Sequence, residues 1–171
     1  VMPADYNAAR ALVKEAAEFE GPVYLRFTRD AIPVIYDENQ KFEIGKAVEL
    51  RRGDDAAIIA NGDTVCIALE AAKQLESRGI HTTVLDMHTV KPLDTEAVME
   101  CIDRCGVIVT VEDHNVINGM GSAVASVAGQ AGRGRVRIIG VQDHFGMSAP
   151  YERLLALNGI TAENICKNVT E

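Results

Sequence analysis

Three of the four histidines stand where their side chains could bind a metal ion or transfer protons. His88, His114 and His144 each follow an apolar run, and each has an Asp one or two residues before it. Imidazole and carboxylate groups form a common ligand set for transition metals. Asp and Asn also favour turns and helix caps for backbone reasons alone. The pattern predicts either a metal or acid/base site or, as the interpretation we favour, polar turns that meet another domain or subunit.

The segment Val111–Val124 is the most distinctive of the chain. It contains Asp113 and His114 and leads through Gly119 and Gly121 into a run of small residues with helical spacing. Glycines at a helix start can bring backbone amides to a phosphate. Val124 occupies the third glycine position of a dinucleotide-binding fingerprint, so that match is poor. We favour close packing of the helix against a sheet or a neighbouring subunit, with an anion site as the alternative.

Arg29 follows a predicted strand at 23–28. A guanidinium at the carboxyl end of a strand suits a phosphate or carboxylate group through bidentate hydrogen bonds. Strand alternation places Arg26 and Arg29 on opposite sides, so at most one is expected to point into a given cleft. From the residues alone, a surface ion pair with Asp30 or another acid is the favoured interpretation.

The cysteines and the charge exclude several kinds of site and partner. Four cysteines without a CxxC pair predict free thiols in a reducing compartment, and Cys101 and Cys105, four apart, are expected to be buried rather than to bind metal. The formal net charge is −8, from 17 basic and 25 acidic residues, so we expect neither nucleic acid nor a membrane surface as a partner. We also find no signal-peptide pattern or long apolar run, and predict a cytoplasmic protein.

Apolar periodicity predicts an α/β fold. Strand and helix patterns alternate over most of the chain, and the strands are near-continuous Ile and Val runs, typical of strands covered on both faces. The run 42–50, which follows no crossover helix, is predicted as an antiparallel edge strand. We therefore expect a three-layer, doubly wound, mostly parallel five-stranded sheet. The predicted strands are 56–60, 81–86, 107–111 and 136–141, and the predicted helices are 65–77, 95–105, 122–130, 151–157 and 162–169.

The first 36 residues form a separate pattern. One helix beginning near Asp5 and the strand at 23–28 cannot bury a core alone. We predict that residues 1–36 are the end of a preceding α/β domain, that 36–41 is a linker, and that 37–171 form one domain. The chain begins at Val1 rather than Met, which suggests an excised section.

Three segments in this order resemble the carboxyl-terminal part of transketolases. They are Pro3–Asp5, Gly21–Arg29 and Val111–Val124, and the likeness is closest to the separate C-terminal subunit of split transketolases. Ile44–Ala47 and Asp86–Asp94 are similar as well. The resemblance therefore spans nearly the whole chain.

The resemblance implies thiamine-diphosphate-dependent transfer of a two-carbon ketol unit between sugar phosphates, as in the pentose phosphate pathway. It implies that residues 1–36 finish the pyrimidine-binding domain and that Arg29 contacts the substrate phosphate. Thiamine diphosphate and magnesium belong to the complete enzyme. We expect none in this fragment, which alone should be inactive and should need an N-terminal subunit or the remainder of the chain, within a dimer.

Two other interpretations remain open. Deoxyxylulose-phosphate synthases and the beta subunits of 2-oxo acid dehydrogenases share this domain. A different class of function is a regulatory or interaction module that binds an anion or a metal at the edge formed by Asp113, His88, His114 and His144.

Overall fold

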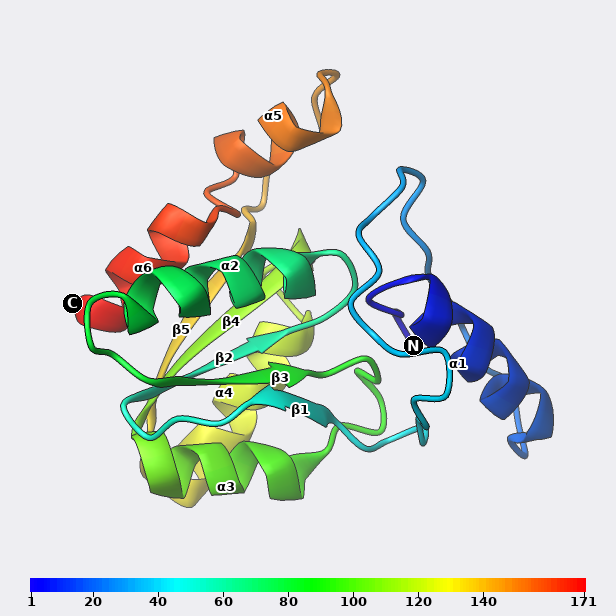
Figure 1. Ribbon diagram of the computed structural model, residues 1–171, viewed down its shortest axis with the longest axis horizontal. Helices are drawn as coiled ribbons and strands as arrows, with labels where there is room; N and C mark the ends of the chain where they lie inside the picture. Colours follow the sequence, from blue (N-terminus) through cyan, green and yellow to red (C-terminus); the bar gives the residue numbers. More distant parts are fainter.

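The fold consists of a five-stranded sheet between two layers of helices, with an N-terminal arm at one end (Figure 1). The computed structural model describes all 171 residues. The strands are β1 (Val48–Arg51), β2 (Ala56–Ala60), β3 (Thr82–Asp86), β4 (Val107–Asn115) and β5 (Arg135–Val141). The helices are α1 (Tyr6–Glu18), α2 (Thr64–Glu76), α3 (Thr95–Cys105), α4 (Met120–Ala131), α5 (Tyr151–Leu157) and α6 (Ala162–Thr170).

The sheet has the predicted composition. Its strand order is β1-β3-β2-β4-β5, with all neighbours parallel except β1, which pairs antiparallel with β3. Helices α2 and α6 cover one face and α3 and α4 the other (Figure 1), so every residue of β2 and β3 is buried. The doubly wound fold class and the antiparallel edge strand are confirmed. The edge strand is shorter than the run 42–50 because only its last residues reach β3.

Each face of the sheet has its own hydrophobic core. The larger cluster has 21 buried residues and joins the sheet to α2 and α6, and the smaller has 11 and joins it to α3 and α4. Ala4, Ala8 and Leu12 of the N-terminal arm (residues 1–36) belong to the larger cluster. The arm therefore packs on the same core as the sheet. None of the helices combines the length and apolar character that a membrane span requires.

The predicted strand at 23–28 is absent. In this segment the backbone hydrogen bonds are those with Val1, whose amino group donates to the Tyr24 carbonyl (2.8 Å) and whose carbonyl accepts from the Arg26 amide (2.9 Å). A strand needs a neighbour along its length to pair its peptide groups. The prediction was wrong because the residue pattern of 23–28 suits a strand, but no second strand lies beside it in this chain.

Tyr36 is not part of a solvated linker. Its ring is buried and stacks edge-on against Phe42 at 4.8 Å, and its hydroxyl donates to Asp86 at 2.8 Å. Residues 37–41 between the two rings are exposed, as expected of a linker. The predicted linker was therefore wrong at its first residue, because a tyrosine can bury its ring and still satisfy its hydroxyl.

Candidate functional site

The start of α4 is occupied by a carboxylate of the chain itself. Glu112, in β4, is 1% exposed, and its two oxygens accept from the backbone amides of Met120 and Gly121, both at 2.7 Å. Burial raises the pKa of Glu112, while these two hydrogen bonds oppose the rise. The positive end of the helix dipole is thus already matched by an internal negative charge.

Gly119 and Gly121 make room for this carboxylate and for the sheet. A Cβ at Gly119 would collide with the Glu112 carboxylate, and one at Gly121 would lie 2.5 Å from Ile138 and Thr110. The favoured interpretation, close packing of the helix, is confirmed. The alternative of a phosphate bound at these glycines was wrong, because Glu112 takes the amides that such an anion would need.

The three histidines at the predicted edge do not converge on one site. His88 is fully buried, whereas His114 and His144 are exposed. No group of three His, Cys, Asp or Glu side chains is arranged to hold a metal ion. The metal alternative was wrong because His88 lies in the core while His114 and His144 are exposed, and Asp113 is instead paired with Arg26.

Buried ionisable groups lie between the N-terminal arm and the end of β3. Asp5 caps α1 through the Ala8 amide (2.7 Å) and accepts from the Ile35 and Tyr36 amides, while the Tyr36 hydroxyl donates to Asp86. Burial raises the pKa of Asp86 to about 7. The network fastens Tyr36 to the start of α1 and to the end of β3.

Arg29 lies in a cleft between the arm and the segment that leads into α5. The cleft has a volume of about 610 Å³. Arg29 is exposed, and no hydrogen bond or ion pair engages its guanidinium, so the predicted ion pair with Asp30 is not formed. The cleft is lined by Arg26, Phe27, Thr28, Arg29, Asp30, Asp113, Met147, Ser148, Ala149, Pro150, Tyr151 and Leu154.

Arg26 lines the same cleft, contrary to expectation. Strand alternation separates Arg26 from Arg29 only if the segment is a strand, and it is not one. The two guanidinium groups differ, however, in their hydrogen bonds. Arg26 donates to the Asp113 backbone oxygen at 2.7 Å and to its carboxylate at 3.5 Å, whereas Arg29 is unpaired. The cleft therefore presents one free guanidinium.

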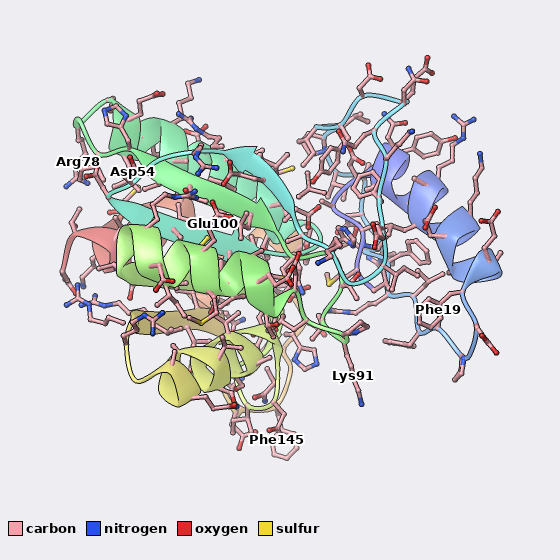
Figure 2. The ribbon with its side chains drawn as sticks, turned by 90° about the horizontal axis from the view of Figure 1, so that it is seen from below. Phe19, Asp54, Arg78, Lys91, Glu100 and Phe145 are labelled. Carbon is pink, nitrogen blue, oxygen red and sulfur yellow. The ribbon has the colours of Figure 1, made fainter.

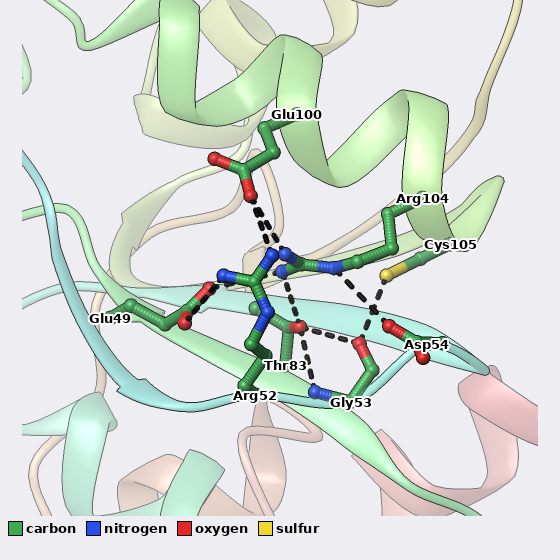
Figure 3. Close-up of polar contacts among 8 residues, drawn as sticks. All are labelled: Glu49, Arg52, Gly53, Asp54, Thr83, Glu100, Arg104 and Cys105. Carbon is green, nitrogen blue, oxygen red and sulfur yellow. Dashed lines mark hydrogen bonds and ion pairs between the residues drawn. The ribbon is translucent and has the colours of Figure 1, made fainter.

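A second polar cluster lies at the opposite end of the strands and is structural (Figure 3). Arg104 of α3, with 14% of its side chain exposed, donates to Glu49 of β1 (3.0 Å), Thr83 of β3 (2.8 Å) and Glu100 (2.8 Å). It fastens the short edge strand to its covering helix. Cys105 donates to the Gly53 carbonyl, and all four cysteines are free.

The family of the chain follows from its sequence and this fold. The family model described as "Transketolase, C-terminal domain" matches residues 45–165, most of the chain. The chain belongs to this family. The match covers the sheet and its helices as far as the first turn of α6, and leaves residues 1–44 and 166–171 outside.

Several relatives cover the chain from end to end. A "Putative transketolase C-terminal section" of Methanocaldococcus jannaschii is 38% identical over all of this chain, and an apulose-4-phosphate transketolase subunit of Phocaeicola vulgatus is 39% identical over all of it. A solved structure titled "Split gene transketolase, inactive beta4 tetramer" superposes with a TM-score of 0.95 at 43% identity over 99% of this chain. The chain spans 54 to 55% of the length of these three proteins.

The structure also adds residues that sequence reasoning did not single out. Glu112, Tyr36 and Tyr151 each make a polar contact with a residue at least eight positions away. Glu112 had one usable signal, a carboxylate at the end of a buried strand followed by a glycine-flanked helix start. Tyr36 and Tyr151 had none, because their partners are 50 and 38 residues away.

Proposed function

We propose that this chain is the C-terminal part of a transketolase that transfers a two-carbon ketol unit between sugar phosphates. The observation that carries the proposal is the unpaired Arg29 guanidinium in a cleft, within a chain that aligns end to end with transketolase subunits and sections. A planar guanidinium without an internal partner can bind a phosphate through two parallel hydrogen bonds. Arg29 is the residue we assign to the substrate phosphate.

The proposed enzyme needs a second part. The relatives named as a transketolase subunit or as a C-terminal section are nearly twice as long as this chain, and their names indicate a companion polypeptide. We propose an N-terminal subunit, or the remainder of a longer chain, as the partner, in a homodimer of the complete unit located in the cytoplasm. On this proposal residues 1–36 end the pyrimidine-binding domain and 37–171 are the C-terminal domain, which agrees with the lack of a strand partner for 23–28 within this chain.

The cofactor of the proposed enzyme is thiamine diphosphate with magnesium, which supplies the carbanion chemistry of ketol transfer. The residues of this chain do not fit the diphosphate and its metal ion. Magnesium requires carboxylate and phosphate oxygens in octahedral geometry, and no suitable group of carboxylates is present. The glycine-flanked start of α4 uses its amides on Glu112. We assign cofactor binding to the companion part.

Substitution of Arg29 tests the substrate role. In the enzyme reconstituted with its companion, Arg29→Ala should raise the KM for xylulose 5-phosphate about tenfold or more, since charge-assisted hydrogen bonds contribute about 1.5–3 kcal/mol. The KM for hydroxypyruvate, a ketol donor without a phosphate, should not change. Arg78→Ala is the matched control, because this exposed arginine lies at the far end of the molecule from Phe19 of the arm (Figure 2). Equal KM values in the variant and the parent would refute the role.

A second activity has support among the relatives. The 1-deoxy-D-xylulose-5-phosphate synthase 1 of Geobacter sulfurreducens is 40% identical over 95% of this chain, which covers 26% of that protein. Its name implies a sugar-phosphate product, so the Arg29 variant does not separate the two activities. Product analysis does, because only the synthase forms a 1-deoxy sugar phosphate.

A further inference from the structure

The Asp113 carboxylate joins the two segments that border the Arg29 cleft. Arg26 of the N-terminal arm donates to the backbone oxygen of Asp113 at 2.7 Å and to its Oδ2 at 3.5 Å. Tyr151, the first residue of α5, donates its hydroxyl to the same Oδ2 at 3.2 Å. The Asp113 side chain is only 21% exposed, so water competes weakly for these contacts. One carboxylate therefore connects parts of the chain 87 and 38 residues away from it.

The Tyr151 contact matters because packing holds α5 weakly. No residue of this seven-residue helix is buried, and the loop before it is almost entirely exposed. Phe145 of that loop is 98% exposed and projects from the molecule in Figure 2. In Figure 1, α5 stands apart from the sheet, on the same side as the loop of the arm near residue 30. The hydrogen bond from the Tyr151 hydroxyl to Asp113 therefore helps to fix the position of α5, which forms one wall of the cleft.

Asp113 also decides which arginine is free. The ionisable residues that line the cleft with a formal charge are Arg26, Arg29, Asp30 and Asp113. Arg26 is held by Asp113, and the guanidinium of Arg29 has no partner. A phosphate that enters the cleft therefore meets one guanidinium whose donors are all available. Without the Asp113 carboxylate, Nη2 of Arg26 would become a second donor nearby, while Nη1 would remain on the backbone oxygen of residue 113.

We propose that Asp113 and Tyr151 are positioning residues of the substrate cleft. Asp113 retains Arg26 as an internal cation, and Tyr151 holds the Met147–Leu154 wall against it, so that the substrate phosphate is directed to Arg29. This inference rests on the proposed function and extends it, because it gives residues of the sheet edge and of α5 a part in substrate specificity.

The first test removes one hydroxyl. In the reconstituted enzyme, Tyr151→Phe should raise the KM for xylulose 5-phosphate about three- to tenfold, the loss expected for one hydrogen bond that places a binding wall. Neither kcat nor the KM for hydroxypyruvate should change, because no reacting group is removed. Tyr6→Phe is the control, since Tyr6 of α1 is 68% exposed and its hydroxyl makes no hydrogen bond.

The outcomes separate this inference from the proposed function when Arg29→Ala is measured in parallel. If Arg29→Ala raises the KM for the phosphorylated donor and Tyr151→Phe does not, the phosphate role stands and the positioning role is refuted. If Tyr151→Phe changes both KM values and kcat together, the tyrosine is merely structural. If Arg29→Ala has no effect, both roles fail.

The second test uses charge. Arg29→Ala leaves the lining of the cleft with one excess negative charge, and adding Asp113→Asn removes it while keeping an oxygen that can accept from Tyr151. The double variant should therefore have a KM for xylulose 5-phosphate about threefold or more below that of Arg29→Ala, because loss of the carboxylate frees Nη2 of Arg26 for the phosphate while Nη1 stays on the backbone oxygen of residue 113. Loss of a structural contact alone would not lower the KM. A KM of the double variant equal to or above that of Arg29→Ala would therefore contradict the inference.

Discussion

Asp86 and His88 are buried ionisable residues whose pKa values shift in opposite directions. Burial raises the pKa of Asp86 to about 7 and lowers that of His88 to about 4, because it disfavours the charged form of each. Between about pH 4 and 7 the folded protein keeps a proton on Asp86 that the unfolded chain has lost. Its contribution to stability therefore falls as pH rises, whereas that of His88 increases between about pH 4 and 6.5.

Replacing Asp86 isolates its contribution to the pH dependence of stability. Asp86→Asn retains an oxygen that accepts from Tyr36 but cannot ionise. Relative to the parent, its free energy of unfolding should increase by on the order of 2 kcal/mol between about pH 4.5 and 7.5. Urea unfolding at the two pH values measures this, with Asp30→Asn as an exposed control. A difference between variant and parent that is the same at both pH values would show that Asp86 does not titrate as described.

At the scale of elements, apolar periodicity and turn residues were enough to predict the parallel strands and the helices between them. The four parallel strands and their helices lie where apolar spacing placed them, within a few residues. Besides the late start of β1, the main error in the sheet is β4, which continues to Asn115 rather than ending at 111. Its last residues are polar, yet Asn115 pairs with Val141 after a register shift. The end of β4 depends on pairing with β5, and the strand predicted at 23–28 is absent because it has no neighbour to pair with. Sequence periodicity reveals neither.

Two glycines of α4 give a matched test of how this helix packs. Gly121→Ala should destabilise the protein by about 1–3 kcal/mol, because the new Cβ would collide with Ile138 and Thr110. Gly129→Ala should stabilise it by about 0.5–1 kcal/mol, since open space surrounds that position and alanine favours a helix. Thermal or urea unfolding measures both. Equal effects of the two substitutions would contradict the close contact between the start of α4 and the sheet.

At the scale of the whole molecule, the site depends on contacts between distant segments. The likeness to transketolases singled out Arg29, but no spacing indicated that Asp113 would hold Arg26 or that Tyr151 would reach the same carboxylate. The His edge failed for the same reason, since residue types alone do not show which loops converge. The arm shares a core with the sheet, yet its segment 23–28 lacks strand neighbours.

The most direct measurement is ketol transfer by this chain with and without its companion part. With thiamine diphosphate, magnesium, xylulose 5-phosphate and an aldose phosphate, we expect no turnover by the chain alone, because it lacks a group that fits the diphosphate and its metal. Adding the companion subunit should give turnover at a rate that saturates with its concentration. Turnover by the chain alone, or none by the assembled pair, would contradict the account.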